Sequence, residues 1–354
     1  MLKKIWTNIK YILEPISKVM SNVINFISLS IVYFIGIGSV SIVMKIFRKH
    51  FLELKKQNKK SNWHEHKLTK QPLGDYYRTF WWKMNILGIS CFYHDAAACL
   101  MKNGIVVAAA EEEIFTRIKH DISFPVNAIN YCLKEGNINI NQVDYVGFYE
   151  KPLLKFERLL SQHLEMFPRS FWSFYKALPS WLNEKLRIPS IIRKKIKYKG
   201  DILFIEHHLA HVASVFLVSP YEESAILTVD GVGEWATASY GYGKGNEITL
   251  LKELRFPNSV GLLYSTVTAH LGFSVNNSEY KVMGLSPYGK PNYYDKFKKI
   301  VNVKEDGSIE FDMSYFDYHY KLTMPSRKFV EEFGVIRKPN EEVTQRHKDI
   351  AASS

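Results

Sequence analysis

Residues 85–113 read NILGISCFYHDAAACLMKNGIVVAAAEEE, and residues 225–253 read AILTVDGVGEWATASYGYGKGNEITLLKE. Each stretch has the pattern of an apolar strand, an aspartate-bearing turn, a second strand, a glycine-containing turn and a third strand. Asp95 stands in the first turn of one copy and Asp230 in that of the other. A repeat of this kind predicts an α/β protein of two similar lobes, which hold a nucleotide or a phosphate between their first hairpins.

A histidine motif lies between the two copies. Glu206-His-His-Leu-Ala-His211 follows an apolar run that reads as a buried strand, and apolar residues at helical spacing follow it. His207 and His211 are one turn apart on this predicted helix, so their imidazoles leave the same face. Two such imidazoles can share a divalent metal ion that takes oxygen ligands from elsewhere. The alternative is a pair of surface histidines at the start of a helix.

The turn of the second copy can supply the missing oxygen ligand. Asp230 stands at the end of an apolar strand, where its carboxylate can ligate a metal ion. Gly231 and Gly233 let the backbone turn sharply and approach a ligand closely, with amides that can face phosphate oxygens. The alternative is an Asp-Gly hairpin that only reverses the chain. We predict a metal site of His207, His211 and Asp230.

Seven motifs follow one another along the chain: Tyr93-His94-Asp95, residues 113–121, Phe124-Pro125, residues 206–211, residues 230–235, residues 279–289 and residues 344–352. In this order they resemble the NodU/CmcH family of O-carbamoyltransferases, which modify nodulation factors, antibiotics and related natural products. The resemblance covers roughly three quarters of the chain. It implies an actin-like fold of the ASKHA, ribonuclease H-like type, with a bound divalent metal that is iron, or zinc as the alternative.

The resemblance also implies a two-step reaction. Family members make carbamoyl-adenylate from carbamoyl phosphate and ATP in a YrdC-like domain, and transfer the carbamoyl group to a hydroxyl of a small natural-product or glycan acceptor. This sequence ends at Ser354, before the family's adenosine segment, a further metal-binding aspartate and the YrdC-like domain. We therefore expect a first actin-like lobe at 85–224, an incomplete second lobe at 225–354 and no activity of this chain alone. A fragment, a frameshift product or a split enzyme with a separate partner chain would each account for this.

Further site residues can be assigned from the motifs. His94 is the candidate general base for the acceptor hydroxyl, because an imidazole titrates near neutral pH; the alternative is a histidine that caps the turn at Asp95. Asp95 would hold its hairpin or contact the cation. Lys119 and Lys281 are candidate cations for phosphate or for the developing carbamoyl oxyanion, and a solvated surface role is the alternative for each.

The first 84 residues form a different kind of segment. Residues 19–44 carry no charge, and a helix over about 23–44 would be about 33 Å long, enough to cross a bilayer. Seven Lys and Arg lie in residues 45–60 against four before Val19, which predicts a single-pass anchor in residues 1–50 with the C-terminal domain in the cytoplasm. A buried globular helix is the alternative. Residues 51–84 form a basic and aromatic linker that includes Tyr76–Trp82.

The charge distribution limits the partners. Residues 1–84 hold 15 Lys and Arg against 4 Asp and Glu, whereas the remaining 270 residues hold 32 against 31. The excess flanks the apolar segment and suits anionic lipid, so nucleic acid is not expected as a partner. The segment 1–84 is similar to small membrane proteins encoded beside saxitoxin-type carbamoyltransferases, which would make the chain a fusion. Residues 151–200 are predicted to be a helical insertion that shapes the acceptor site or rests on the membrane.

Carbamoyl transfer to a small hydroxyl acceptor at the cytoplasmic membrane face is therefore the leading function. One alternative is a membrane-anchored pseudoenzyme or partner subunit. Another is tRNA threonylcarbamoyl transfer, which uses a related metal-binding fold. The near-neutral body and the apolar segment argue against that second alternative.

Overall fold

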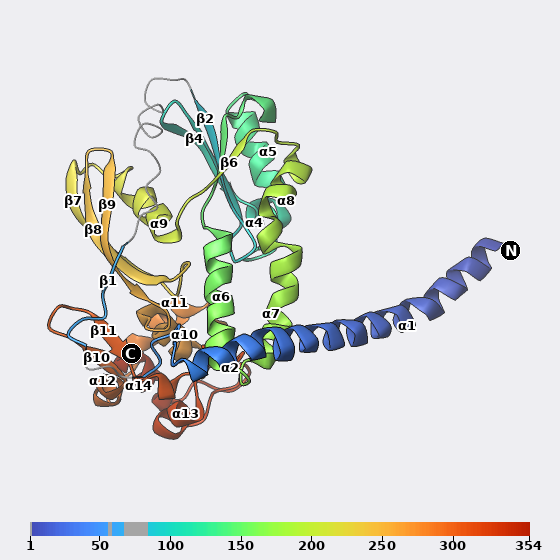
Figure 1. The fold of residues 1–354 in the computed structure, drawn as a ribbon. Coiled ribbons are helices and arrows are strands. Elements are labelled where there is room, and N and C mark those ends of the chain that lie inside the picture. The colour runs from blue at the N-terminus through green and yellow to red at the C-terminus, as the bar shows by residue number, and fades with distance from the viewer. Residues whose placement is uncertain (1, 56–58, 67–83) are drawn as a thin grey trace.

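The computed structural model describes residues 2–55, 59–66 and 84–354, and its α/β architecture contains two main sheets (Figure 1). Residues 1, 56–58 and 67–83 lie outside this description, and with them the aromatic cluster Tyr76–Trp82 of the predicted linker.

The first sheet has five strands: β2 (Asn85–Ser90), β3 (Ala97–Lys102), β4 (Ile105–Glu111), β5 (Tyr145–Phe148) and β6 (Asp201–Phe204). Their order is β4-β3-β2-β5-β6, in which β2, β3 and β4 form an antiparallel meander and β5 and β6 run parallel to β2. Alternate residues of β2 and β3, such as Leu87 and Leu100, are fully buried. They pack with Ile129 of α5 (Val126–Glu135) and Ile192 of α8 (Ile188–Ile196), so both helices cover one core.

The second sheet repeats the meander. Its strands are β7 (Glu223–Val229), β8 (Ala236–Lys244) and β9 (Glu247–Arg255), all antiparallel to their neighbours. The short strand β1 (His64–Glu65) pairs with β9, so a strand that precedes the first sheet in sequence closes an edge of the second. Helix α9 (His207–Phe216) packs its Val212 and Phe216 against Leu250 of this sheet. The two meanders expected from the sequence repeat are therefore present.

The C-terminal part of the chain is mainly helical. It contains α10 (Val260–His270), α11 (Glu279–Leu285), α12 (Tyr294–Ile300), α13 (Arg327–Phe333), α14 (Gln345–Ser353) and the antiparallel pair β10 (Val301–Val303) and β11 (Ile309–Phe311). Val267, Phe329 and Ile350 are fully buried in a second core that these helices share.

Two long helices connect the upper and lower parts of the molecule in Figure 1. These are α6 (Pro152–Met166) and α7 (Phe171–Asn183), which with α8 fall within the predicted helical insertion at 151–200. A short helix, α4 (Glu113–Thr116), follows the first meander. The α6–α7 turn, residues 166–171, lies at the base of the molecule, beside the N-terminal helix.

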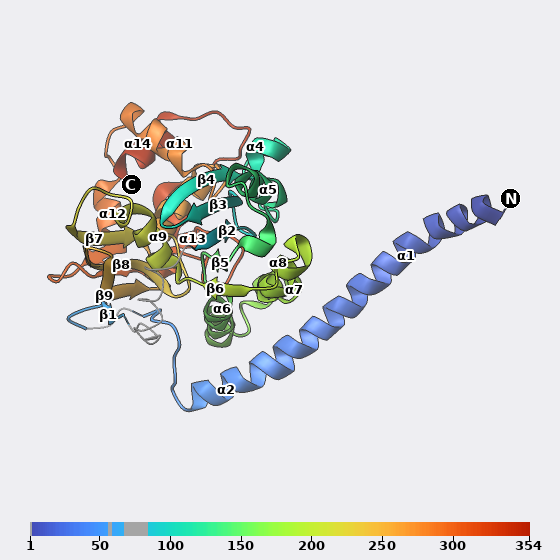
Figure 2. The ribbon, with the colours of Figure 1, turned by 90° about the horizontal axis from the view of Figure 1, so that it is seen from above.

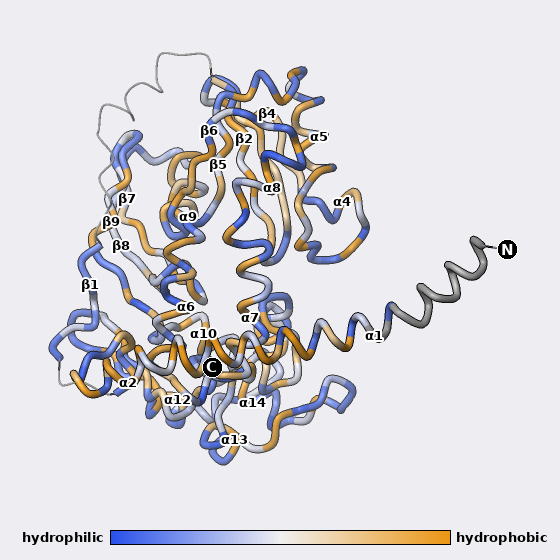
Figure 3. Tube along the Cα trace, turned by 45° about the vertical axis from the view of Figure 1, so that its right-hand side comes forward, coloured by the Kyte–Doolittle hydropathy of each residue, from blue (hydrophilic) through white to orange (hydrophobic). Residues whose placement is uncertain are grey.

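The N-terminal helix is continuous from α1 (Leu2–Ile31) through a π-helical segment (Val32–Ile37) to α2 (Gly38–Ile46). Its N-terminal half projects away from the rest of the molecule (Figures 1 and 2). An 18-residue window within residues 17–46 has a mean hydropathy of 2.2, and the apolar character of this helix is visible along the tube in Figure 3. This helix is long and apolar enough to span a membrane, and it contains the predicted segment 23–44.

The apolar helix also packs on the α6–α7 turn. The hydroxyl oxygens of Tyr33 and Ser170 lie 2.8 Å apart, Ser41 donates a hydrogen bond to the carbonyl of Leu164, and the Lys45 ammonium donates to the carbonyl of Phe167. Tyr33 is buried among aromatic rings there. The contacts extend from Phe26 to Lys45, about 28 Å of helix axis. The helix is therefore a packed element and not only a tether.

Candidate metal centre

The three predicted metal ligands come from two neighbouring elements. His207 is the first residue of α9, and His211 lies one turn later on the same face. Asp230 directly follows β7, whose neighbour in the sheet is β8. Strand β6 ends at Phe204 and Glu206 has extended backbone angles, so the helix begins where the histidine motif begins.

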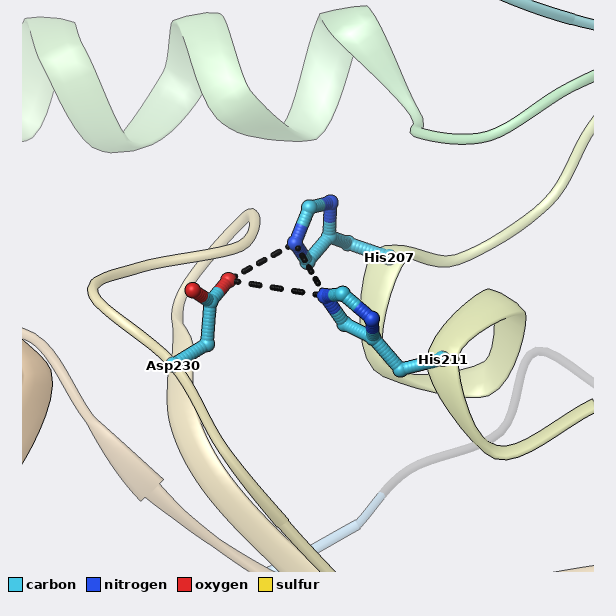
Figure 4. A group of neighbouring side chains, drawn as sticks. All are labelled: His207, His211 and Asp230. Atoms are coloured by element: carbon cyan, nitrogen blue, oxygen red, sulfur yellow. Dashed lines mark hydrogen bonds and ion pairs between the residues drawn. The ribbon is translucent and has the colours of Figure 1, made fainter. Parts of the chain in front are cut away.

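The side chains of these residues converge, as Figure 4 shows. The Nε2 atom of His207 lies 2.7 Å from Oδ2 of Asp230, and Nε2 of His211 lies 3.0 Å from Nε2 of His207 and 3.8 Å from the same oxygen. Ligand atoms that share one ion at about 2.1 Å lie roughly 3 Å apart. Two imidazoles and one carboxylate with further positions open suit ferrous iron or zinc. The residues therefore fit the expected ion.

Electrostatics in the group favour a cation. Burial would raise the pKa of Asp230, but hydrogen bonds from His207 and His211 outweigh burial and hold this pKa far below its ordinary value. The hydrogen bond to Asp230 raises the pKa of His211 above its ordinary value of 6.5. The facing ring nitrogens of His207 and His211 need a proton or a metal ion between them, since two lone pairs repel each other.

The middle histidine of the motif has a structural role. The two ring nitrogens of His208 lie 2.6 Å from Oγ1 of Thr228 and 3.0 Å from the carbonyl oxygen of Ala236. Burial lowers the pKa of His208 to about 4, so its ring is neutral at physiological pH. His208 thereby ties α9 to β7 and to the start of β8.

Glu234 is a buried residue whose role the sequence analysis did not identify. Its carboxylate accepts hydrogen bonds from the backbone N–H of His207, at 3.2 Å, and of Lys151, at 2.8 Å. These donors lie at the starts of α9 and α6, where backbone N–H groups lack helical partners. Glu234 therefore fixes both helix starts beside the metal group. The available signal was its position four residues after Asp230, inside a motif already singled out.

Two glycines allow the backbone to pack closely around Asp230. A Cβ atom at Gly261 would lie 2.5 Å from the carbonyl carbon of Asp230, and one at Gly233 would lie 3.0 Å from Cβ of His207. Gly261 was not identified from the sequence. At Gly231, a Cβ atom would meet Leu262 at 3.8 Å, an ordinary contact, so this glycine is not required by packing within the protein.

His94 belongs to a second polar group. Its Nδ1 atom lies 2.9 Å from one carboxylate oxygen of Asp95, and Nδ1 of His120 lies 2.8 Å from the other. Burial raises the pKa of Asp95, but the bonds to His120 and His94 outweigh it, so this pKa is lowered. In the described part of the chain, no hydrogen bond or ion pair joins His94 to the metal group. The neighbouring Tyr93 reaches Asn276 after α10, where its hydroxyl donates a 3.1 Å hydrogen bond.

The predicted cations Lys119 and Lys281 are both exposed, and Lys281 lies over the rings of Phe273 and Tyr280. Two buried cations, Lys155 and Arg158, lie on α6 instead.

Lys155 forms a 2.5 Å ion pair with Glu150. Arg158 is 8% exposed, and its Nε atom has no hydrogen-bond partner among the described residues. Burial lowers the pKa of Arg158 to about 10, against the opposing charges of Tyr93, Glu150 and Glu234. Arg158 therefore lies close to the residues around the metal group.

Comparisons with known proteins agree with this arrangement of motifs. Residues 85–354 match the family model described as "Carbamoyltransferase N-terminus". The protein sll1178 of Synechocystis sp. is 50% identical over 279 residues, which cover 76% of this chain and 45% of that protein. Nodulation protein NolNO of Sinorhizobium fredii is 33% identical over 269 residues, which cover 74% of this chain and 36% of that protein. The chain thus spans less than half the length of either relative.

Solved structures give weaker similarities. YeaZ from Pseudomonas aeruginosa is 12% identical with a TM-score of 0.26, and the match covers 50% of this chain and 71% of that one. The Ppx/GppA family member of Aquifex aeolicus is 11% identical with a TM-score of 0.25, over 59% and 63% of the two chains.

Proposed function

The chain belongs to the carbamoyltransferase family, and from this premise we propose that it takes part in transferring a carbamoyl group to a hydroxyl of a small acceptor. The observation that carries the proposal is the convergence of His207, His211 and Asp230, two segments of the family match, on one point. The two antiparallel meanders support an actin-like arrangement in which these segments face each other.

His207, His211 and Asp230 would hold the divalent ion, with iron or zinc as the fitting metals. When bound, the ion would supply a positive charge that polarises the carbamoyl oxygen. The protein contributes the ionised carboxylate of Asp230 and a fixed orientation of α9. Glu234 provides that orientation, because its carboxylate holds the backbone N–H of His207.

The acceptor hydroxyl must lose a proton as it attacks. His94 is our candidate for receiving it, because the contact between its Nδ1 and Asp95 leaves Nε2 free. His94 is partly exposed, so an acceptor can approach it from solvent. The alternative role of His94, capping the turn at Asp95, uses the same contact, and only a kinetic test separates the two.

The site that binds the carbamoyl donor requires positive charge. Arg158 fits this role better than Lys119 or Lys281, since it is buried near Glu234 and its Nε–H group has no partner in residues 2–55, 59–66 and 84–354. We propose carbamoyl phosphate and ATP as the donor substrates of the complete system. The part of the relatives that this chain does not span would then make carbamoyl-adenylate, on the same protein or on a separate chain.

We further propose that the apolar helix enters a lipid bilayer and that the domain lies on the cytoplasmic side. Lys45, Arg48 and Lys49 at the end of the helix support this side. The α6–α7 turn packs along the helix, so it must approach or enter the lipid with it. Trp172 is 62% exposed beside this contact, which suits a position at the membrane interface.

The test of the function uses the full chain in detergent with labelled carbamoyl phosphate, ATP and a soluble polyhydroxyl acceptor. The C-terminal portion of sll1178 is added as a separate polypeptide. We expect labelled carbamate ester only with both polypeptides present, and its loss in the variant His207→Ala/His211→Ala. The control variant His50→Ala/His64→Ala removes two histidines outside the metal group. Equal product from the wild type and the metal-group variant would contradict the proposal.

A further inference from the structure

A cavity of about 450 Å³ is lined by the α6–α7 turn and by residues before and at the start of α13, elements other than α9 and β7, which position the metal group. The start of α13 and the lower end of α7 lie at the base of the molecule in Figure 1. The cavity walls come from Leu54 after α2, from Met166 and Arg169 in the α6–α7 turn, and from the segment 313–328 before and at the start of α13. None of these residues belongs to the group of His207, His211 and Asp230. The Ser173 hydroxyl, which donates a 3.0 Å hydrogen bond to the carbonyl of Tyr320, joins α7 to the opposite wall.

The wall of this cavity carries more cations than carboxylates. It carries the cations Arg169, Lys321, Arg327 and Lys328 against the single carboxylate of Asp317. Lys321 pairs with Asp317, Lys328 with Asp312 and Arg327 with Glu331, so three of these four cations have carboxylate partners. The guanidinium of Arg169 lies 4.0 Å from the ring centroid of Tyr320, and no carboxylate partner for it occurs in the described ranges. Arg169 is thus held in place, and its guanidinium makes no hydrogen bond to the residues that the structure describes.

A buried histidine in the same wall also lacks a partner. His319 is 5% exposed, and its Nδ1 atom makes no hydrogen bond within the residues that the structure describes. Burial lowers the pKa of His319 to about 4, so its neutral ring can donate from one nitrogen. A buried polar atom without a hydrogen-bond partner is costly to stability, and a ligand oxygen would remove this cost.

The cavity lies next to the apolar helix. Leu164 and Phe167, which flank Met166, accept hydrogen bonds from Ser41 and Lys45 of that helix. Leu54 in the cavity wall follows the helix by only a few residues. If the helix lies in lipid, the cavity lies at the depth of the headgroups.

We propose that this cavity binds a phosphate group, carried by a lipid headgroup at the membrane surface or by a small soluble phosphate. The planar guanidinium of Arg169 can donate hydrogen bonds to two phosphate oxygens, and Lys328 and His319 can donate to the other oxygens. The phosphate site is independent of the metal group. Only its lipid source rests on the membrane placement proposed above.

Calorimetric titration of the full chain in dodecyl maltoside tests the proposal. The probes are dioctanoyl phosphatidic acid, dioctanoyl glycerol, which lacks the phosphate, and inorganic phosphate. The variant Arg169→Gln/Lys328→Gln should bind the phosphate-bearing probe at least about tenfold more weakly, because two charge-assisted contacts are lost. The matched control Lys134→Gln/Lys194→Gln makes the same charge change on exposed residues of α5 and α8 and should bind as the wild type does.

Each result either identifies the source of the phosphate group or contradicts the proposed site. Binding of phosphatidic acid with neither dioctanoyl glycerol nor inorganic phosphate bound supports a lipid headgroup. Equal binding of inorganic phosphate supports the site and assigns it to a soluble ligand. Absence of binding by either phosphate probe, or an equal loss in the control variant, overturns the proposal. If the double variant does not fold, Arg169→Lys keeps the charge, loses the planar guanidinium and should still weaken binding.

Discussion

Nδ1 of His66 lies 2.8 Å from a carboxylate oxygen of Glu253 in β9. His66 precedes the family match, which begins at Asn85, whereas Glu253 belongs to the second meander. Nε2 of the same ring lies 3.4 Å from Glu206, the residue directly before His207. A side chain of the N-terminal extension therefore reaches the helix start that carries the metal group.

His66 makes stability depend on pH in a defined direction. Its hydrogen bond to Glu253 raises the pKa of His66 above the ordinary 6.5. A histidine whose pKa is raised by folding contributes to the free energy of unfolding. This contribution is complete below pH 6.5 and is lost as the pH rises through the raised pKa. We expect His66→Gln to lower the free energy of unfolding by about 1–3 kcal/mol at pH 6 and by less at pH 9, measured by thermal unfolding.

The control for this prediction is His64→Gln, on the short strand β1 that directly precedes His66. Burial lowers the pKa of His64, so this variant should not share the acid-side loss. An equal decrease in the free energy of unfolding at pH 6 and pH 9 in His66→Gln would show that the charge of His66 does not contribute to stability.

The metal group makes a second prediction. Purified full chain should carry iron or zinc, and His207→Ala/His211→Ala should lower the metal content at least about tenfold, because two of three ligands are removed. Metal per chain is measured by mass spectrometry of the dissolved protein. Circular dichroism should show that the variant remains folded, since His208 still ties α9 to the sheet. Equal metal content in the wild type and the double variant would show that the two histidines are structural residues and not metal ligands.

Gly261 tests the backbone around Asp230. A Cβ atom there would overlap the backbone of Asp230, which cannot move without displacing the carboxylate. We expect Gly261→Ala to destabilise the protein by about 1–3 kcal/mol and to weaken metal binding. The control Gly284→Ala lies on α11 with nothing within 4 Å of the new atom, so helix propensity should leave stability unchanged or raise it. Equal behaviour of the two variants would contradict the packing argument.

The sequence predicted the parts of the site that lie on regular elements. Helical spacing placed His207 and His211 on one face, and the apolar run before Asp230 placed this residue at a strand end. The buried cation Arg158 was not predicted, because it is distant in sequence from Tyr93 and Glu234, which lie near it. Lys119 and Lys281 were chosen from their motifs, and a motif carries no information on exposure. The packing of Tyr33 against Ser170 was also inaccessible, since apolar spacing does not identify a partner.

The apolar helix predicts the behaviour of the chain in lipid. The full chain should remain with membranes after carbonate extraction, whereas a chain that starts at Asn85 should not insert. In vesicles, brominated lipid should quench the wild type more than Trp172→Phe, because exposed Trp172 lies beside the helix. Recovery of the full chain in the carbonate-soluble fraction would remove the membrane proposal.

Arg158 gives the most informative test of the donor site. A buried guanidinium without a full set of partners is costly to stability, so replacing it by an apolar side chain of similar length should not destabilise the fold. We expect Arg158→Met to keep or raise the unfolding temperature while it weakens binding of a non-hydrolysable carbamoyl-adenylate analogue at least about tenfold, measured by calorimetry and thermal unfolding on the same preparation. Arg193→Met, on the exposed side of α8, should change neither quantity. Lower stability with unchanged binding would show that Arg158 serves the fold, and the donor would then need another cation.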